Sequence, residues 1–211
     1  MERQLDTSKF YLVGNNLGVD FVNTRIRENG APKDLLESFE DLVTWAVRAK
    51  LLDLSQANAL LKEWSGRPKA AKVFKRALML REALREMIID AAQGATIKPS
   101  ALEGINLIMK EESGYAEVVR IEGGFKKRFH ADFSEPGRIL ALIAEAVADL
   151  LCYGNHAYLR KCESPECVLY FYDVTKNHGR RWCSMASCGN RAKAAAFYQR
   201  QNKKQKHKRL T

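Results

Sequence analysis

Apolar residues recur at intervals of three and four along most of the first 110 residues, which is the spacing that lines one face of a helix. The pattern predicts helices over 15–27, 39–46, 55–64, 74–91 and 100–108. Ser38, Ser55 and Ser100 stand at the starts of three of these segments, where a serine side chain can cap the first backbone amides. The Gly66-Arg67-Pro68 stretch should separate the third helix from the fourth.

The apolar period changes to two in the next segment. Apolar and polar residues alternate over 125–133, and the preceding 115–121 is rich in β-branched and aromatic residues. Gly123-Gly124 between them predicts a β-hairpin. An apolar helical stripe over 139–150 then predicts a core helix that runs to about residue 159. The first 158 residues are therefore expected to form a helix-rich domain with one hairpin.

Four of the five cysteines cluster in the last quarter of the chain, with the spacing Cys162-x4-Cys167-x15-Cys183-x4-Cys188. Each pair is close enough in sequence to place two sulfurs on one ion, and four thiolates complete the tetrahedral shell that Zn²⁺ prefers. An iron–sulfur cluster also takes four cysteines, although its usual spacings differ. We expect one zinc ion with a structural role, because a closed shell leaves no coordination position for a substrate.

The residues around these cysteines predict the shape of the module. The run 168–172 indicates a strand, 177–179 a turn, 181–183 a return strand, and the Ala-rich run after Cys188 a helix. Knuckle, hairpin and helix in this order are typical of a treble-clef finger. The expected fold class is α+β and mostly helical, with a helix-rich N-terminal domain that carries a β-hairpin and a small C-terminal treble-clef-like zinc finger. The fifth cysteine, Cys152, is expected to pack where the preceding helix meets the finger.

The net charge of +10 is unevenly distributed along the chain. Residues 161–211 hold twelve Lys or Arg and three acids, whereas residues 1–160 are close to neutral. Cations concentrated beside a finger predict a polyanionic partner, with DNA as the first candidate. The candidate nucleic-acid-binding residues are cations of the finger loop and of the last helix: Arg180, Arg181, Lys193, Arg200, Lys203, Lys204 and Lys208.

Two other partners fit the same charge. The finger could dock an acidic protein as an adaptor, or it could bind RNA by stacking bases on Tyr170, Tyr172 and Trp182. A membrane partner is not expected, because the basic tail has few large apolar residues and the stretch 139–152 is too short and too charged to span a bilayer. Residues 1–10 lack the apolar segment of a secretory signal, so a cytoplasmic location is expected.

The run 180–193, which contains Cys188-Gly189-Asn190-Arg191, resembles the CGNR zinc-finger family. The motif at 17–24 resembles the opening of the ABATE domain that commonly precedes this finger. The resemblance covers essentially the whole chain and implies a bacterial, stress-linked transcription regulator, with an ABATE-like domain at 1–158 and the finger at 159–211. In such a protein the finger would bind DNA, and the N-terminal domain would sense a small molecule or a partner.

Three polar residues interrupt the apolar motif at 17–24. Asp20, Asn23 and Thr24 fall on one side of a helix, where they could line a ligand pocket or bond to a neighbouring element of the fold. The sequence shows no Ser/His/acid set, no phosphate loop and no pair of carboxylates in a catalytic context, and its four histidines lack metal-ligand spacing. We therefore expect no catalytic residues and a protein that is not an enzyme.

Overall fold

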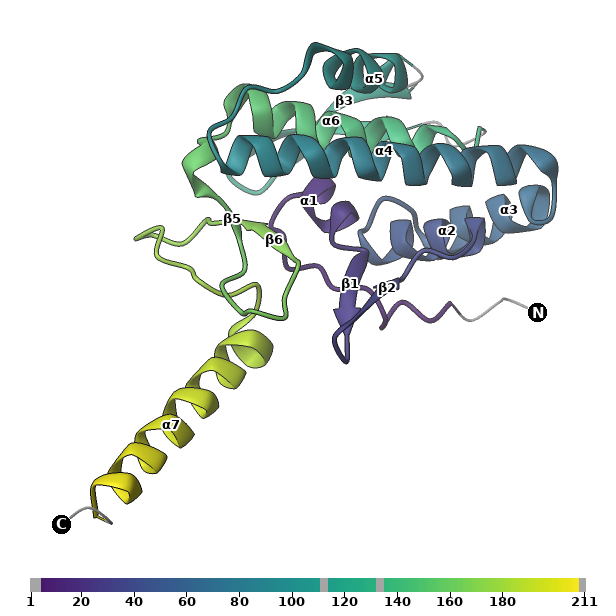
Figure 1. Ribbon diagram of the computed structural model, residues 1–211. Coiled ribbons are helices and arrows are strands. Elements are labelled where there is room, and N and C mark those ends of the chain that lie inside the picture. The colour runs from purple at the N-terminus through teal and green to yellow at the C-terminus, as the bar shows by residue number, and fades with distance from the viewer. Residues whose placement is uncertain (1–4, 111–113, 132–134, 209–211) are drawn as a thin grey trace.

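The computed structural model describes residues 5–110, 114–131 and 135–208, and it shows a helical body from which one helix projects (Figure 1). The body contains, in chain order, α1 (Leu17–Val22), β1 (Arg25–Glu28), β2 (Ala31–Asp34), α2 (Phe39–Arg48), α3 (Leu54–Trp64), α4 (Pro68–Ala92), α5 (Pro99–Met109), β3 (Gly114–Ile121), β4 (Gly124–Ala131) and α6 (Arg138–Tyr153). A 3₁₀ turn (His156–Tyr158), β5 (Leu159–Lys161), β6 (Tyr170–Tyr172), a π turn (Met185–Gly189) and α7 (Asn190–Lys208) follow. This architecture confirms the expected fold class.

The long helix α4 is the centre of the body. It packs against α1, α2, α5 and α6, and Figure 1 shows α5 and α6 on one side of it and α2 and α3 on the other. Its buried stripe includes Val73, Leu80, Leu84 and Met87, which follows the predicted helical period. None of the described helices combines the length and the apolar composition that a membrane crossing requires.

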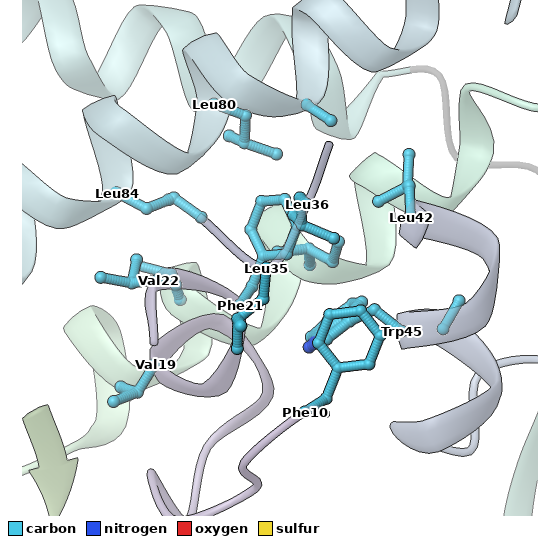
Figure 2. Packing of buried hydrophobic residues seen from close by; sticks show 14 of the residues in the cluster. Phe10, Val19, Phe21, Val22, Leu35, Leu36, Leu42, Trp45, Leu80 and Leu84 are labelled. Atoms are coloured by element: carbon cyan, nitrogen blue, oxygen red, sulfur yellow. The ribbon is translucent and has the colours of Figure 1, made fainter. Parts of the chain in front are cut away.

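Aromatic residues fill the space between α1, α2 and the N-terminal segment (Figure 2). Phe10, Phe21 and Trp45 are buried, and the Phe21 and Trp45 ring centroids lie 4.9 Å apart at an interplanar angle of 60°. Tilted pairs at this distance are favourable beyond their burial by about 0.5–1.5 kcal/mol. The short helix α1 is thereby held in the core, although six residues alone would not form a stable helix.

Close packing between α1 and α6 leaves no room for a side chain at Gly18. A Cβ built there would lie 1.9 Å from Cγ2 of Val147, a fully buried side chain on α6. We expect Gly18→Ala to destabilise the protein by about 1–3 kcal/mol through overpacking. Gly104→Ala on α5 is the matched control, because nothing lies within 4 Å of its Cβ position, and it should stabilise by about 0.5–1 kcal/mol. Urea unfolding of both variants measures the difference, and equal effects would contradict the packing.

Several helix ends differ from the sequence predictions. The α3 helix is capped by Asp53, whose side chain accepts from the Gln56 amide in a capping box, and not by Ser55. The α5 helix begins at Pro99 without a side-chain cap, so the expected Ser100 cap is wrong; proline fixes the backbone angle that a first helical residue needs. The α6 helix ends at Tyr153 and not near 159. Ser38 caps α2 as predicted.

The β1–β2 hairpin was not predicted, since the helix expected over 15–27 ends at Val22. Its turn consists of Asn29 and Gly30, with φ of 50° and 80°. Two consecutive left-handed residues make the tight turn that suits a hairpin, and Asn-Gly is the strongest sequence signal for it. The β3–β4 hairpin is confirmed, with Ile121 paired to Gly124, whereas residues 132 and 133 of the predicted strand lie outside the described residues.

Candidate metal centre

The four clustered cysteines meet at one point of the structure. Cys162 follows β5 and Cys167 precedes β6, so the first pair lies in the loop that joins these strands, while Cys188 lies in the π turn that leads into α7. All four are buried, and their sulfurs lie within 4.8 Å of one another. The Cys167 Sγ lies 3.7 Å from the Cys183 Sγ, which is itself 3.6 Å from the Cys188 Sγ.

These sulfur–sulfur distances fit a zinc ion. Four ligands at about 2.3 Å from a central Zn²⁺ form a tetrahedron whose edges are about 3.8 Å long. The donor set is all thiolate and closed, so zinc held by Cys162, Cys167, Cys183 and Cys188 would supply folding free energy and not Lewis-acid chemistry. The site therefore fits one structural zinc ion, as the cysteine spacing predicted.

The surroundings favour negative charge at Cys167 but oppose it at Cys162 and Cys183. A hydrogen bond from the Cys183 thiol lowers the pKa of Cys167 to about 5. The same contact, together with burial, raises the pKa of Cys183 well above its usual range, because sulfurs this close cannot all ionise without a cation among them. Further support comes from the Cys183 amide, 3.3 Å from Cys162 Sγ, and from the Arg191 guanidinium, 3.1 Å from Cys188 Sγ. Such contacts fix ligand orientation in metal sites.

The strand pairing around the first two cysteines differs from the prediction. The β6 strand pairs antiparallel with β5, not with 181–183. The 181–183 segment instead runs beside the cysteine loop, where the Glu163 amide donates to the Arg181 carbonyl at 3.0 Å. The Cys162 amide donates to the Leu169 carbonyl at 2.9 Å. This bond extends the short ladder and brings the two sulfurs of the loop together.

A buried carboxylate that the sequence analysis did not assign holds the loop after β6. Asp173 is fully buried, and its side chain accepts from the Thr175 amide and hydroxyl and from the Arg180 amide, at 3.0, 2.6 and 2.8 Å. Burial opposes ionisation, but these hydrogen bonds outweigh it and lower the pKa of Asp173. The signal in the sequence is Asp173-x-Thr175, the spacing of a side chain that caps its own turn.

Arg180 joins the finger to the N-terminal segment. Its guanidinium donates to the carbonyls of Trp182, Cys183 and Val13, and lies 4.1 Å above the Phe171 ring. These contacts use the guanidinium within the fold, and a phosphate contact of Arg180 stays a prediction. Arg181, in contrast, is exposed and pairs with Glu163 at 2.6 Å, an exposed contact of small energetic value.

The three polar residues of the 17–24 motif bond within the protein. Asn23 donates from Nδ2 to the Tyr170 carbonyl at 2.8 Å and accepts from the Tyr170 amide at 2.9 Å. The Thr24 hydroxyl donates to the Phe21 carbonyl and accepts from Arg81. The Asp20 carboxylate accepts from the Gly14 amide at 2.7 Å. Of the two interpretations left open by the sequence, these contacts support the structural one, and a role of these residues in a ligand pocket stays a prediction.

The Asn23 side chain hydrogen-bonds to both backbone groups of Tyr170 in β6, as the backbone of a neighbouring strand would. We expect Asn23→Ala to destabilise the protein by about 2–4 kcal/mol, since a buried amide and carbonyl would lose their partners. Asn15→Gly is the control: the exposed Asn15 side chain donates to the Tyr172 carbonyl at the same strand, and glycine adopts the φ of 56° of this position without strain. Its loss should cost less than about 1 kcal/mol. Similar losses in urea unfolding would show that Asn23 does not act as this bridge.

Asp20 makes the stability of the body pH-dependent. Burial raises the pKa of Asp20 to about 6, so the folded state binds its proton more tightly than the unfolded chain, whose aspartate titrates near 4. The stability contributed by the protonated form is lost as pH rises through 6. Asp20→Asn keeps the acceptor for Gly14, and its stability relative to wild type should rise by about 1 kcal/mol between about pH 5 and pH 7.5. A constant difference in urea unfolding of the zinc-loaded proteins would contradict this.

The last helix carries the concentrated cations away from the body (Figure 1). Seven of the 19 residues of α7 are Lys or Arg and none is acidic. Lys193 and Arg200 are exposed. The backbone of Lys203, Lys204 and Lys208 lies in α7, and their side chains lie outside the described residues.

Cys152, expected to pack against the finger, is instead exposed on α6.

A helical body joined to a four-cysteine knuckle and a projecting helix defines a zinc-finger protein with an N-terminal helical domain. The ABATE family model, described as "Putative stress-induced transcription regulator", matches residues 15–154, and the CGNR zinc finger model matches residues 158–201. The chain belongs to the ABATE family and ends in a CGNR zinc finger. No curated protein matches the chain.

Proposed function

We propose that this protein is a transcription regulator that binds DNA through its finger and α7, while its N-terminal domain responds to a ligand or partner. One observation carries the proposal: α7 starts at the metal centre, projects from the body and is strongly basic (Figure 1). From Asn190 to Asn202 every residue except Ala192 is exposed. A helix with this charge that packs so little of its surface suits a polyanionic partner.

The dimensions of α7 suit a DNA groove. A helix of 19 residues is about 28 Å long, and a major groove about 12 Å wide admits a helix. Ala194, Ala195 and Ala196 keep its first turns slim. The metal centre fixes where α7 begins, since Cys188 lies two residues before its first residue. Zinc would thus set the angle at which the cations meet the phosphates.

A second cluster of polar groups lies beside the start of α7. Lys176, Asn177 and Arg181 line a shallow depression of about 620 Å³ together with Trp182 and Met185. The exposed Arg181–Glu163 pair is weak enough for a phosphate to replace Glu163. We propose that Arg181 contacts the DNA backbone next to the groove that α7 enters.

RNA recognition by stacked tyrosines has less support. The Tyr170 ring is buried against the body, and the Tyr172 hydroxyl accepts from the Asn155 amide at 3.0 Å. Neither ring is presented as an open stacking platform. In the adaptor alternative, α7 would bind an acidic protein in place of DNA.

Titration of a fluorescent DNA duplex with the zinc-loaded protein tests the proposal by anisotropy. We expect the logarithm of the affinity to fall linearly with the logarithm of the salt concentration, with a slope of about −0.9 for each phosphate contact. Selection from a pool of random duplexes then identifies the preferred sequence. Binding that is absent at low salt, or that does not change with salt, would overturn the proposal.

A further inference from the structure

A cleft of about 560 Å³ lies where the two parts of the protein meet. One wall is the β1–β2 hairpin with the N-terminal segment, and the other is the metal centre with the start of α7. Ligand sites commonly have volumes of about 300–1,000 Å³ and occur at junctions between domains. The cleft therefore has the size and the position of an effector site, and we call it the junction cleft.

Arg27 brings a fixed guanidinium to the hairpin wall. Its Nε and Nη2 donate to the Gly30 carbonyl at 3.2 and 2.7 Å, which holds the side chain in place. Its Nη1 is 3.9 Å from the Glu166 carboxylate, and both side chains are substantially exposed. A contact this long and this exposed contributes little, so an anionic group in the junction cleft can take the place of Glu166.

Arg191 brings a second guanidinium from the opposite wall. Its Nη2 donates to Cys188 Sγ at 3.1 Å, and this bond uses one of the five N–H donors of a guanidinium. The rest of the lining is mixed: it has the apolar side chains of Ile26, Val168 and Leu169 and polar ones such as those of Ser184 and Ser187. The acid Glu28, also at the cleft, is engaged by Lys33 at 2.7 Å.

The sulfurs limit how much negative charge a ligand can carry. Cys167, Cys183 and Cys188 all line the junction cleft, and as metal ligands they are thiolates. Four thiolates around one Zn²⁺ leave a net charge of about −2. Arg191 offsets this charge only in part, so a second or third negative charge on a ligand would meet like charge on this wall. The lining thus favours a single anionic group attached to an apolar body.

We propose that the junction cleft binds a small organic monoanion, such as a carboxylate, between Arg27 and Arg191, with its apolar body against Ile26 and Leu169. The ligand would touch the N-terminal domain and the finger at once, so its binding would favour the arrangement in which the hairpin holds the finger. The proposal gives a location and a chemical class to the ligand response proposed above, on which it rests.

Fluorine NMR of the full-length zinc-loaded protein tests the site with 4-fluorobenzoate as the probe. For a ligand of this size we expect a dissociation constant on the order of 1 mM. Arg27→Gln should weaken binding by about tenfold. Arg25→Gln is the matched control, because Arg25 lies on the same strand but pairs with Glu82 of α4 at 3.2 Å, and it should bind the probe as wild type does.

Two further measurements separate the junction cleft from other anion sites. A Lys193→Glu/Arg200→Glu variant, changed only on α7, should keep its affinity for 4-fluorobenzoate. The amine 4-fluorobenzylamine, similar in shape but positively charged, should not bind. Equal loss in Arg25→Gln and Arg27→Gln, loss in the α7 variant, binding of the amine, or no binding of 4-fluorobenzoate at about 10 mM would each overturn the proposal. None of these outcomes changes the DNA titration, so the two proposals can fail separately.

Discussion

Cys183→Ser is expected to lose its zinc to a chelator at a concentration that leaves the expected one equivalent on the native protein. Cys183 Sγ lies 3.7 and 3.6 Å from two of the other sulfurs and within 4.8 Å of the third, so its loss leaves only three of the four ligands. Structural zinc sites contribute about 10–16 kcal/mol of apparent binding free energy, or about 2.5–4 kcal/mol for each of four ligands. Zinc affinity should therefore fall by at least about a hundredfold, as measured by elemental analysis and by competition with a chelator.

Cys152→Ser is the control for this experiment, because Cys152 is the exposed cysteine of α6 and lies outside the cage. It should retain a full equivalent of zinc. Zinc retained by Cys183→Ser, or lost equally from both variants, would show that the four sulfurs do not form the site.

Zinc loss should destabilise the finger more than the helical body. The aromatic core around Trp45 and the helices α2 to α6 do not include the four clustered cysteines, so most of the helical circular-dichroism signal should remain. Hydrogen exchange should increase first in β5, β6 and the start of α7, whose backbone positions depend on the cage. An equal increase in α4 would indicate that the two parts unfold as one unit.

The second large effect is expected on α7. Lys193→Glu combined with Arg200→Glu reverses two exposed charges near the start and middle of the helix, and glutamate keeps a high helix propensity. The affinity for duplex DNA should fall by about a hundredfold at low salt, because two phosphate contacts become repulsive. The salt slope of the affinity should shrink by about two units for the same reason.

A control variant with the same change in net charge, but made on the body, tests whether the position of the cations matters and not only their number. Lys72→Glu combined with Lys75→Glu changes two exposed lysines of α4, on the body. This variant should bind DNA with nearly native affinity. If the α4 and α7 variants lose affinity equally, the overall charge of the chain, and not α7, governs binding.

Short-range patterns in the sequence predicted much of the site. The two cysteine pairs are each separated by four residues, and local chain geometry is enough to place such pairs on one ion. The β3–β4 hairpin followed from alternation and from Gly123-Gly124, and the core helices followed from their apolar period. The β1–β2 hairpin was missed although Asn29-Gly30 signalled it, because the apolar residues before it also fit a helix.

The roles of the polar residues depend on contacts between residues far apart in the sequence, and local sequence patterns do not predict such contacts. Asn23 bonds to Tyr170, 147 positions away, and Arg180 bonds to Val13, 167 positions away. A buried polar atom must find a partner wherever the folded chain supplies one. Helical spacing could therefore place Asn23 on a face, and charge could mark Arg180 as a phosphate ligand, but only the packed structure shows that both hold the finger to the body. The same packing leaves Lys193 and Arg200 of α7 exposed to solvent.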